Sequence, residues 1–234
     1  MMFLLIISLV SNWQTMVKTV ILFDLDGTLL DTAPDLLEAF NILLQRYDKP
    51  VIELNDIRHL LTLGSKYFIQ NYFSGNFESV EIEEIRQEYL AIYSEINYTH
   101  TKLFPGMLEI LQEITQLKLP WGIVTNKLTK HTHESLNVIE LPSQPQTLVC
   151  GDTLAVTKPD PAPLFHACEL MAAPLENVLF IGDSDVDAKA GKKAGIDTLI
   201  VEHGYNFGVG QFDGLGIAAW IKHPKEIMAY IRGC

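Results

Sequence analysis

Apolar and polar residues form two different patterns along this chain. Short, continuous apolar runs occur at Val20–Phe23, Trp121–Val124 and Val178–Ile181, and each ends in polar side chains. Runs of this kind are typical of strands buried on both faces of a parallel sheet. Further strands are expected near residues 147–150 and 197–201. Helical stretches alternate with these strands, which predicts an α/β fold built on a parallel sheet with helices on both faces.

The second pattern has the periodicity of a helix and extends over the segment between Asp31 and about Tyr98. Apolar residues recur there every three or four positions, without a convincing strand. They include Leu36, Leu37, Phe40, Leu43, Leu44, Ile82, Ile85, Tyr89, Ile92, Tyr93 and Ile96. This segment predicts a helical insert in the α/β unit. Other helices are expected near residues 107–117, 130–138, 162–171, 185–195 and 224–231.

Chemically useful side chains stand where the predicted strands end. Asp24 and Asp26 follow the first run, and Thr125 and Asn126 follow the second. Asp183 and Asp187 follow the run at 178–181. Lys158 stands directly before Pro159, and this proline favours the start of the helix that follows. Taken singly, each has an ordinary explanation as a turn, a helix cap or a surface lysine. Ligands of open parallel sheets bind beyond the carboxyl ends of the strands. The joint occurrence therefore favours an active site.

The order Asp-x-Asp-Gly-Thr, Thr-Asn, Lys-Pro and Gly-Asp-x-x-x-Asp resembles the haloacid dehalogenase-like phosphatases from about residue 17 to 204. Segments 30–35, 124–127 and 151–155 look like the bacterial phosphoglycolate phosphatase branch. The resemblance implies a three-layer, Rossmann-like parallel-sheet core with an inserted α-helical cap domain. We expect residues 16–31 and 99–234 to form the core and residues 32–98 to form the cap.

The resemblance also implies a role for each strand-end residue. Asp24 would be the nucleophile that takes the phosphoryl group, and Asp26 the acid that protonates the leaving oxygen and then activates water. Lys158 would compensate the charge of the aspartyl-phosphate. Mg²⁺ is the expected cofactor, held by Asp24, the backbone carbonyl of Asp26 and Asp183. Asp187 would complete this metal site by orienting waters or Lys158.

Substrate contacts are expected on both sides of the site. Thr125, the backbone amide of Asn126 and Lys158 would surround the phosphoryl oxygens. On the insert, Gly64 and Ser65 open a helix whose amides, with Lys66, could meet an anionic group. A solvated helix residue is an equal alternative for Lys66.

The resemblance favours a small phosphorylated metabolite as partner, with 2-phosphoglycolate ahead by a small margin. Thr62, Lys66 and the run 223–226 also look like a relative that acts on N-acetylmuramic acid 6-phosphate. Another sugar-phosphate phosphatase stays open as well. A phosphomutase of the same fold would share every motif, and would release a product isomer instead of free phosphate.

Composition narrows the partners further. Seventeen basic and 29 acidic residues give a net charge of −12, which disfavours nucleic acid and anionic membranes. The three cysteines have no metal-ligand spacing, so free thiols in a reducing, cytoplasmic compartment are expected. A monomer or homodimer is the expected oligomeric state. His131 and His133 would splay apart on a helix and are predicted to lie at the surface.

The first fifteen residues do not belong to this pattern. They begin with an apolar run that is too short to span a bilayer and has no preceding lysine or arginine. Met16 precedes the first strand closely. We therefore expect residues 1–15 to be an upstream extension and Met16 to be the start.

Overall fold

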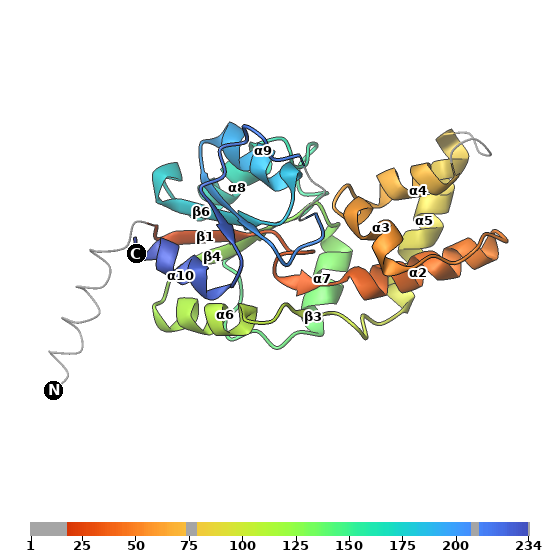
Figure 1. Ribbon diagram of the computed structural model, residues 1–234, viewed down its shortest axis with the longest axis horizontal. Coiled ribbons are helices and arrows are strands. Elements are labelled where there is room, and N and C mark those ends of the chain that lie inside the picture. The colour runs from red at the N-terminus through yellow and green to blue at the C-terminus, as the bar shows by residue number, and fades with distance from the viewer. Residues whose placement is uncertain (1–17, 74–78, 207–210, 234) are drawn as a thin grey trace, which may run out of the picture.

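Six parallel strands form one sheet at the centre of the molecule, with helices on both faces (Figure 1). The computed structural model describes residues 18–73, 79–206 and 211–233. In spatial order the strands are β5 (Thr147–Val149), β4 (Trp121–Val124), β1 (Val20–Phe23), β6 (Val178–Gly182), β7 (Asp197–Val201) and β8 (Ala219–Ile221). The predicted α/β class is confirmed, and β1 lies in the middle between β4 and β6.

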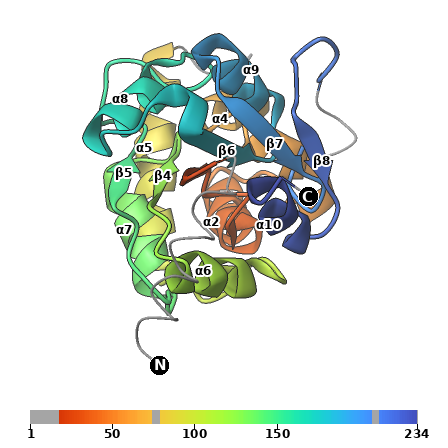
Figure 2. The same cartoon turned by 90° about the vertical axis from the view of Figure 1, so that its left-hand side faces the viewer.

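Helices flank the sheet because its strands are apolar on both faces. They are α6 (Met107–Gln116), α7 (Thr129–Asn137), α8 (Ala162–Leu170), α9 (Asp185–Ala194) and α10 (Lys225–Ile231). Successive strand residues point to opposite faces. Ile21 and Phe23 accordingly pack in the buried cluster that includes α6 and α10, whereas Val20 and Leu22 pack in the cluster that includes α8 and α9. Figure 2 shows these two helix pairs on opposite faces of the sheet.

A helical cap lies beyond the carboxyl end of β1, to the right in Figure 1. It consists of α2 (Ala33–Arg46), α3 (Leu54–Leu61), α4 (Ser65–Phe73) and α5 (Ser79–Glu95). Aromatic rings hold it together: the ring centroid of Phe40 lies 5.1 Å from that of Phe68 and 6.2 Å from that of Tyr89. The chain enters and leaves the cap through an antiparallel pair, β2 (Leu30–Asp31) and β3 (Lys102–Leu103). The predicted inserted helical cap is confirmed.

Some short elements were not predicted from the sequence. Strands β2, β3 and β8 have only two or three residues each, too few for an apolar periodicity to be read. Helix α3 was also missed. The predicted extension 1–15 and the predicted start at Met16 lie outside the described residues. Within the described part of the chain, no helix is both long and apolar enough to cross a membrane.

Candidate active site

Three neighbouring strands bring polar residues to one edge of the sheet. Because β1 is in parallel register with β4 and β6, the residues that follow them reach the same edge. Asp24 and Thr125 line a cavity of about 410 Å³ there, together with Lys158 from the segment between β5 and α8. Asp183 is fully buried at this edge. The structure thus brings together residues that are more than 150 positions apart in the chain.

Lys158 is the cation that joins two of the carboxylates. Its Nζ lies 2.8 Å from Oδ1 of Asp24 and 2.6 Å from Oδ1 of Asp187. The Asn126 side chain holds the backbone of this lysine, accepting from its N–H at 3.0 Å and donating to its carbonyl at 2.9 Å. Burial alone would lower the pKa of Lys158, but Asp187 and Asp24 raise it above its usual value. The side chain is therefore a fixed cation.

Asp187 is held at the N-terminus of α9. Its Oδ2 accepts from the N–H of Ser184 at 3.1 Å and from the hydroxyl of Ser184 at 2.5 Å. The Ser184 hydroxyl in turn accepts from the Asp187 N–H, which completes a capping box. Since Oδ1 accepts from Lys158, both oxygens of Asp187 have donors. Asp187 therefore orients Lys158 by direct contact, and Ser184 fixes Asp187.

The carboxylates at this edge have the arrangement of a cation site. Oxygens of Asp24, Asp183 and Asp187 lie within 4.8 Å of one another. Asp183 Oδ2 accepts a backbone N–H at 2.7 Å, whereas its buried Oδ1 has no hydrogen-bond partner within the described part of the chain. Two glycines leave room for this side chain: a Cβ at Gly27 would lie 2.5 Å from Asp183 Oδ2, and one at Gly204 would lie 2.1 Å from Asp183 Cβ. An oxygen that accepts no hydrogen bond and lies in a space bordered by glycines is suited to be a metal ligand.

Charge balance supports the same conclusion. Burial raises the pKa of Asp24 to about 7, although Lys158 lowers it. Burial, with the charges of Asp187 and Asp24, raises the pKa of Asp183 well above its usual value. Burial is the main cause of both shifts, and the Lys158 ammonium group contacts Asp24 and Asp187 but not Asp183. A divalent cation would balance the excess negative charge and would find the oxygen ligands that hard cations prefer.

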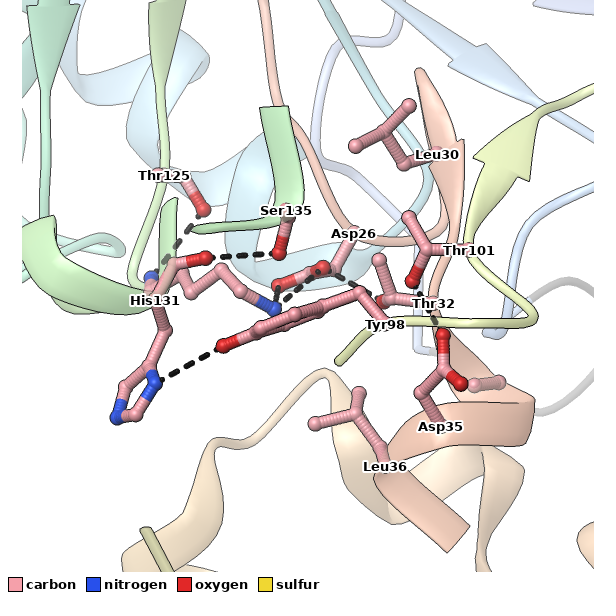
Figure 3. A network of polar contacts seen from close by, with 12 residues as sticks. Asp26, Leu30, Thr32, Asp35, Leu36, Tyr98, Thr101, Thr125, His131 and Ser135 are labelled. Atoms are coloured by element: carbon pink, nitrogen blue, oxygen red, sulfur yellow. Dashed lines mark hydrogen bonds and ion pairs between the residues drawn. The ribbon is translucent and has the colours of Figure 1, made fainter. Parts of the chain in front are cut away.

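Asp26 lies between the core and the cap, with its side chain 24% exposed. Its Oδ1 accepts from the Thr32 hydroxyl at 2.6 Å (Figure 3). The Lys127 ammonium donates to Oδ1 at 3.0 Å and to Oδ2 at 3.2 Å. Lys127 was not among the predicted site residues. Its position directly after Thr125 and Asn126 was a usable signal, but its direction toward Asp26 depends on the packing of β4 beside β1.

The cap supplies the opposite wall of the same cavity. Gly64, Ser65 and Lys66 all line it, so the predicted cap residues do face the predicted core residues. Gly64 adopts a φ of +82°, a conformation that favours glycine, directly before α4. Arg86 was missed by the sequence analysis; it lines the cavity from α5, and its Nε donates to the Ser65 hydroxyl at 3.0 Å. Arg86 and Tyr89, three residues apart, share one face of α5.

The surface position predicted for His131 is wrong. Its side chain is only 5% exposed, and Nδ1 lies 3.1 Å from the Tyr98 hydroxyl (Figure 3) and 3.1 Å from Glu134. Burial, followed by the charge of Lys127, lowers the pKa of His131. His133 is exposed as predicted. The helical spacing correctly separated the two histidines, but which of them faces inward depends on how α7 packs.

A comparison with known families finds one family whose profile spans these residues. The haloacid dehalogenase-like hydrolase family profile matches residues 21–201 of this chain. That span contains every strand-end residue described above, the whole cap and the buried acidic cluster. The match therefore covers nearly all of the candidate site, from Asp24 to Asp187, rather than one motif.

Individual relatives carry two different names. An N-acetylmuramic acid 6-phosphate phosphatase from Pseudomonas putida is 34% identical over 211 residues, covering 90% of this chain and 95% of the relative. A phosphoglycolate phosphatase from Nitrosospira multiformis is 33% identical over 192 residues, covering 80% and 85%. Among solved structures, a haloacid dehalogenase-like hydrolase from Streptococcus pneumoniae superposes with a TM-score of 0.77 at 23% identity, covering 92% of this chain and 98% of that one. This last likeness supports the fold.

Proposed function

The chain belongs to the haloacid dehalogenase-like hydrolase family, and from this premise we propose how its site hydrolyses a phosphomonoester. The family match and the phosphatase names of its relatives make it a phosphatase. The single observation that supports our mechanism best is the contact of Asp24 with Lys158 at 2.8 Å, in a cavity that Asp26 also lines. A carboxylate nucleophile, a charge-compensating cation and a second carboxylate are then within reach of one substrate.

The proposed reaction has two steps. A carboxylate oxygen of Asp24 attacks the phosphorus, the bond from phosphorus to the ester oxygen breaks, and Asp26 gives a proton to that oxygen. Asp26, now ionised, takes a proton from water, whose oxygen attacks the aspartyl-phosphate and releases inorganic phosphate and free Asp24. Splitting the displacement in this way divides one high barrier into two lower ones. Lys158 and Thr125 would neutralise and bind the phosphoryl oxygens during both steps.

Mg²⁺ is the cation that we propose for the acidic cluster. Asp24, Asp183 and the backbone carbonyl of Asp26 would hold it, and Asp187 would keep Lys158 beside it. When bound, Mg²⁺ would neutralise charge on the phosphoryl group and restrict its orientation. The proposal is supported by the Asp183 oxygen that has no hydrogen-bond partner among the described residues, and by the excess of buried carboxylates over ammonium groups.

The substrate that we propose carries a carboxylate as well as a phosphate. Ser65 and Lys66 line the cap side of the cavity, and Arg86 contacts Ser65, so two cations lie across from the phosphoryl site. We take residues 32–98 as the extent of the cap that supplies these groups. A small phosphorylated acid would thus bridge the two walls, with its phosphate on Lys158 and its carboxylate on Lys66.

Between the two candidate acids, we place N-acetylmuramic acid 6-phosphate first. A cavity of about 410 Å³ suits a ligand the size of a substituted sugar better than a two-carbon acid. The relative with that name also covers 90% of the chain, compared with 80% for the phosphoglycolate phosphatase. 2-Phosphoglycolate, the substrate that the sequence motifs favour, stays the second candidate because the same cations would serve it.

The deciding experiment measures phosphate release from each of the two acids with Mg²⁺ and compares their values of kcat/KM. We expect the sugar acid to be preferred by more than about tenfold, equivalent to about 1.4 kcal/mol of transition-state binding. A tenfold preference for 2-phosphoglycolate would reverse our order. A product isomer in place of free phosphate would identify a phosphomutase instead.

We also propose a cytoplasmic enzyme that acts as a monomer or homodimer. Cys150 and Cys168 are free, buried thiols, which supports a reducing compartment. Size-exclusion chromatography with light scattering would test the oligomeric state. A tetramer or larger assembly would contradict it.

A further inference from the structure

Lys127 is a nearly buried cation that the proposed reaction does not use. Its side chain is 6% exposed, and its Nζ donates to both carboxylate oxygens of Asp26, at 3.0 and 3.2 Å. The Thr32 hydroxyl donates to Oδ1 of the same carboxylate at 2.6 Å. These three hydrogen bonds hold the plane of the Asp26 carboxylate in one orientation.

The same ammonium group also contacts the cap. It donates to the Tyr93 hydroxyl at 2.8 Å and lies 4.7 Å from the centre of the Tyr93 ring. Tyr93 belongs to α5 and is 1% exposed, with its ring centroid 4.8 Å from that of Tyr98. Lys127 therefore links the carboxylate of Asp26 in the core to a tightly packed aromatic residue of the cap.

A group that transfers protons must stay within hydrogen-bond reach of the reacting oxygen, and small displacements of such groups reduce rates strongly. Thr32 alone restrains one oxygen of Asp26 and leaves rotation of the carboxylate possible. Lys127 restrains both oxygens and is itself restrained by Tyr93. Its ammonium lines the cavity, yet all the hydrogen bonds described for it are to Asp26 and Tyr93.

We propose that Lys127 is a positioning residue that keeps the Asp26 carboxylate aimed into the cavity, with Tyr93 of the cap holding Lys127 in place. This inference rests on the proposed role of Asp26 in proton transfer. Its consequence is specific: losing Lys127 should impair the steps that need Asp26 and spare the step that does not. A merely structural ion pair would show no such selectivity.

An aryl phosphate separates these steps, because its leaving group departs as a stable anion and needs no proton from Asp26. With 4-nitrophenyl phosphate and Mg²⁺ in a rapid-mixing experiment, Lys127→Met should release a burst of about one equivalent of nitrophenolate at nearly the wild-type rate. The following steady-state rate, which requires Asp26 to activate water, should fall about 10- to 100-fold, the usual effect of removing a partner of an active-site group. Lys130→Met, three residues along on the exposed side of α7, is the matched control and should behave as the wild type.

The Asp26→Asn variant separates a failure of the proposed covalent reaction from a failure of the positioning role of Lys127. That variant should show the same burst with an even slower steady state. If Asp26→Asn gives no burst and no acid-stable phosphoenzyme, the proposed covalent reaction itself fails. If Asp26→Asn behaves as expected but Lys127→Met slows burst and steady state equally, or slows neither, the positioning role of Lys127 is overturned.

Two further variants test the link to the cap and guard against misfolding. Tyr93→Phe keeps the ring but removes the hydroxyl that accepts from Lys127. It should retain the burst and slow the steady state about threefold, and an unchanged steady state would overturn the role of Tyr93. Lys127→Arg keeps the buried charge; should Lys127→Met fail to fold, Lys127→Arg is expected to show the burst with a reduced steady state, and equal slowing of both phases would again contradict the proposal.

Discussion

The two walls of the active-site cavity are built in opposite ways. The core wall consists of side chains from the loops and the helix N-terminus that follow the parallel strands, and Asp24, Lys158 and Asp187 there are almost fully buried and directly paired. The cap wall consists of the start of α4 and one face of α5, and Lys66 on it is exposed. Buried, paired charges tolerate little change, whereas exposed ones contribute modestly. We therefore expect the core wall to determine the chemistry and the cap wall to select the substrate.

The largest effect is expected at the nucleophile. Asp24→Asn keeps the shape of the side chain and removes one buried charge, so the fold should persist while turnover falls below about one hundredth of the wild type. Phosphate release and thermal melting, measured side by side, would check this. Turnover above that level would contradict covalent catalysis by Asp24.

Lys158→Met should damage both activity and stability. Losing the cation should reduce kcat by roughly 100- to 1000-fold. It also leaves Asp24 and Asp187 without their shared partner, and breaking a buried ion pair typically lowers the free energy of unfolding by about 3–5 kcal/mol. Urea unfolding would measure this loss. Lys189→Met, which breaks the more exposed pair with Asp185, should cost no more than about 1 kcal/mol; similar losses for both variants would remove the distinction between buried and exposed charge.

Asp183→Asn tests the metal site. It should raise the Mg²⁺ concentration needed for half-maximal activity at least about tenfold, because even partners of metal ligands have effects of that size. EDTA should abolish wild-type activity, and added Mg²⁺ should restore it. Asp213→Asn, at an exposed acidic residue far along the chain, serves as the control. Activity that persists in EDTA would contradict the metal proposal.

The smallest effect is expected on the cap wall. Lys66→Ala should lower kcat/KM for the phosphorylated acid by up to about fivefold, the equivalent of about 1 kcal/mol for an exposed charge pair. It should leave an aryl phosphate that carries no carboxylate, such as 4-nitrophenyl phosphate, nearly unaffected. Parallel kinetics on the two substrates would measure the difference. An equal loss on both would show that Lys66 does not contact the carboxylate, and Arg86 would then be the cation to test.

Much of the core wall could be predicted from the sequence because its information is local. The apolar runs before Asp24, Thr125 and Asp183 identify buried parallel strands, and parallel strands place their carboxyl ends at one edge. The alternation of Val20, Ile21, Leu22 and Phe23 between two helical layers follows from the same geometry. The helical spacing between Asp31 and Tyr98 likewise predicted a cap without strands, as the described residues of that segment show.

What only the tertiary structure decided are the contacts between segments. The pairing of Lys127 with Asp26 and Tyr93 joins the loops that follow β4 and β1 to helix α5, and the hydrogen bond from Arg86 to Ser65 joins two helices of the cap. Periodicity separates the faces of a helix but does not show which face packs inward, so the buried position of His131 was missed. Local patterns specify where a strand ends or which residues share a face. The partner of a side chain depends on which elements are packed beside it, and that is a property of the whole fold.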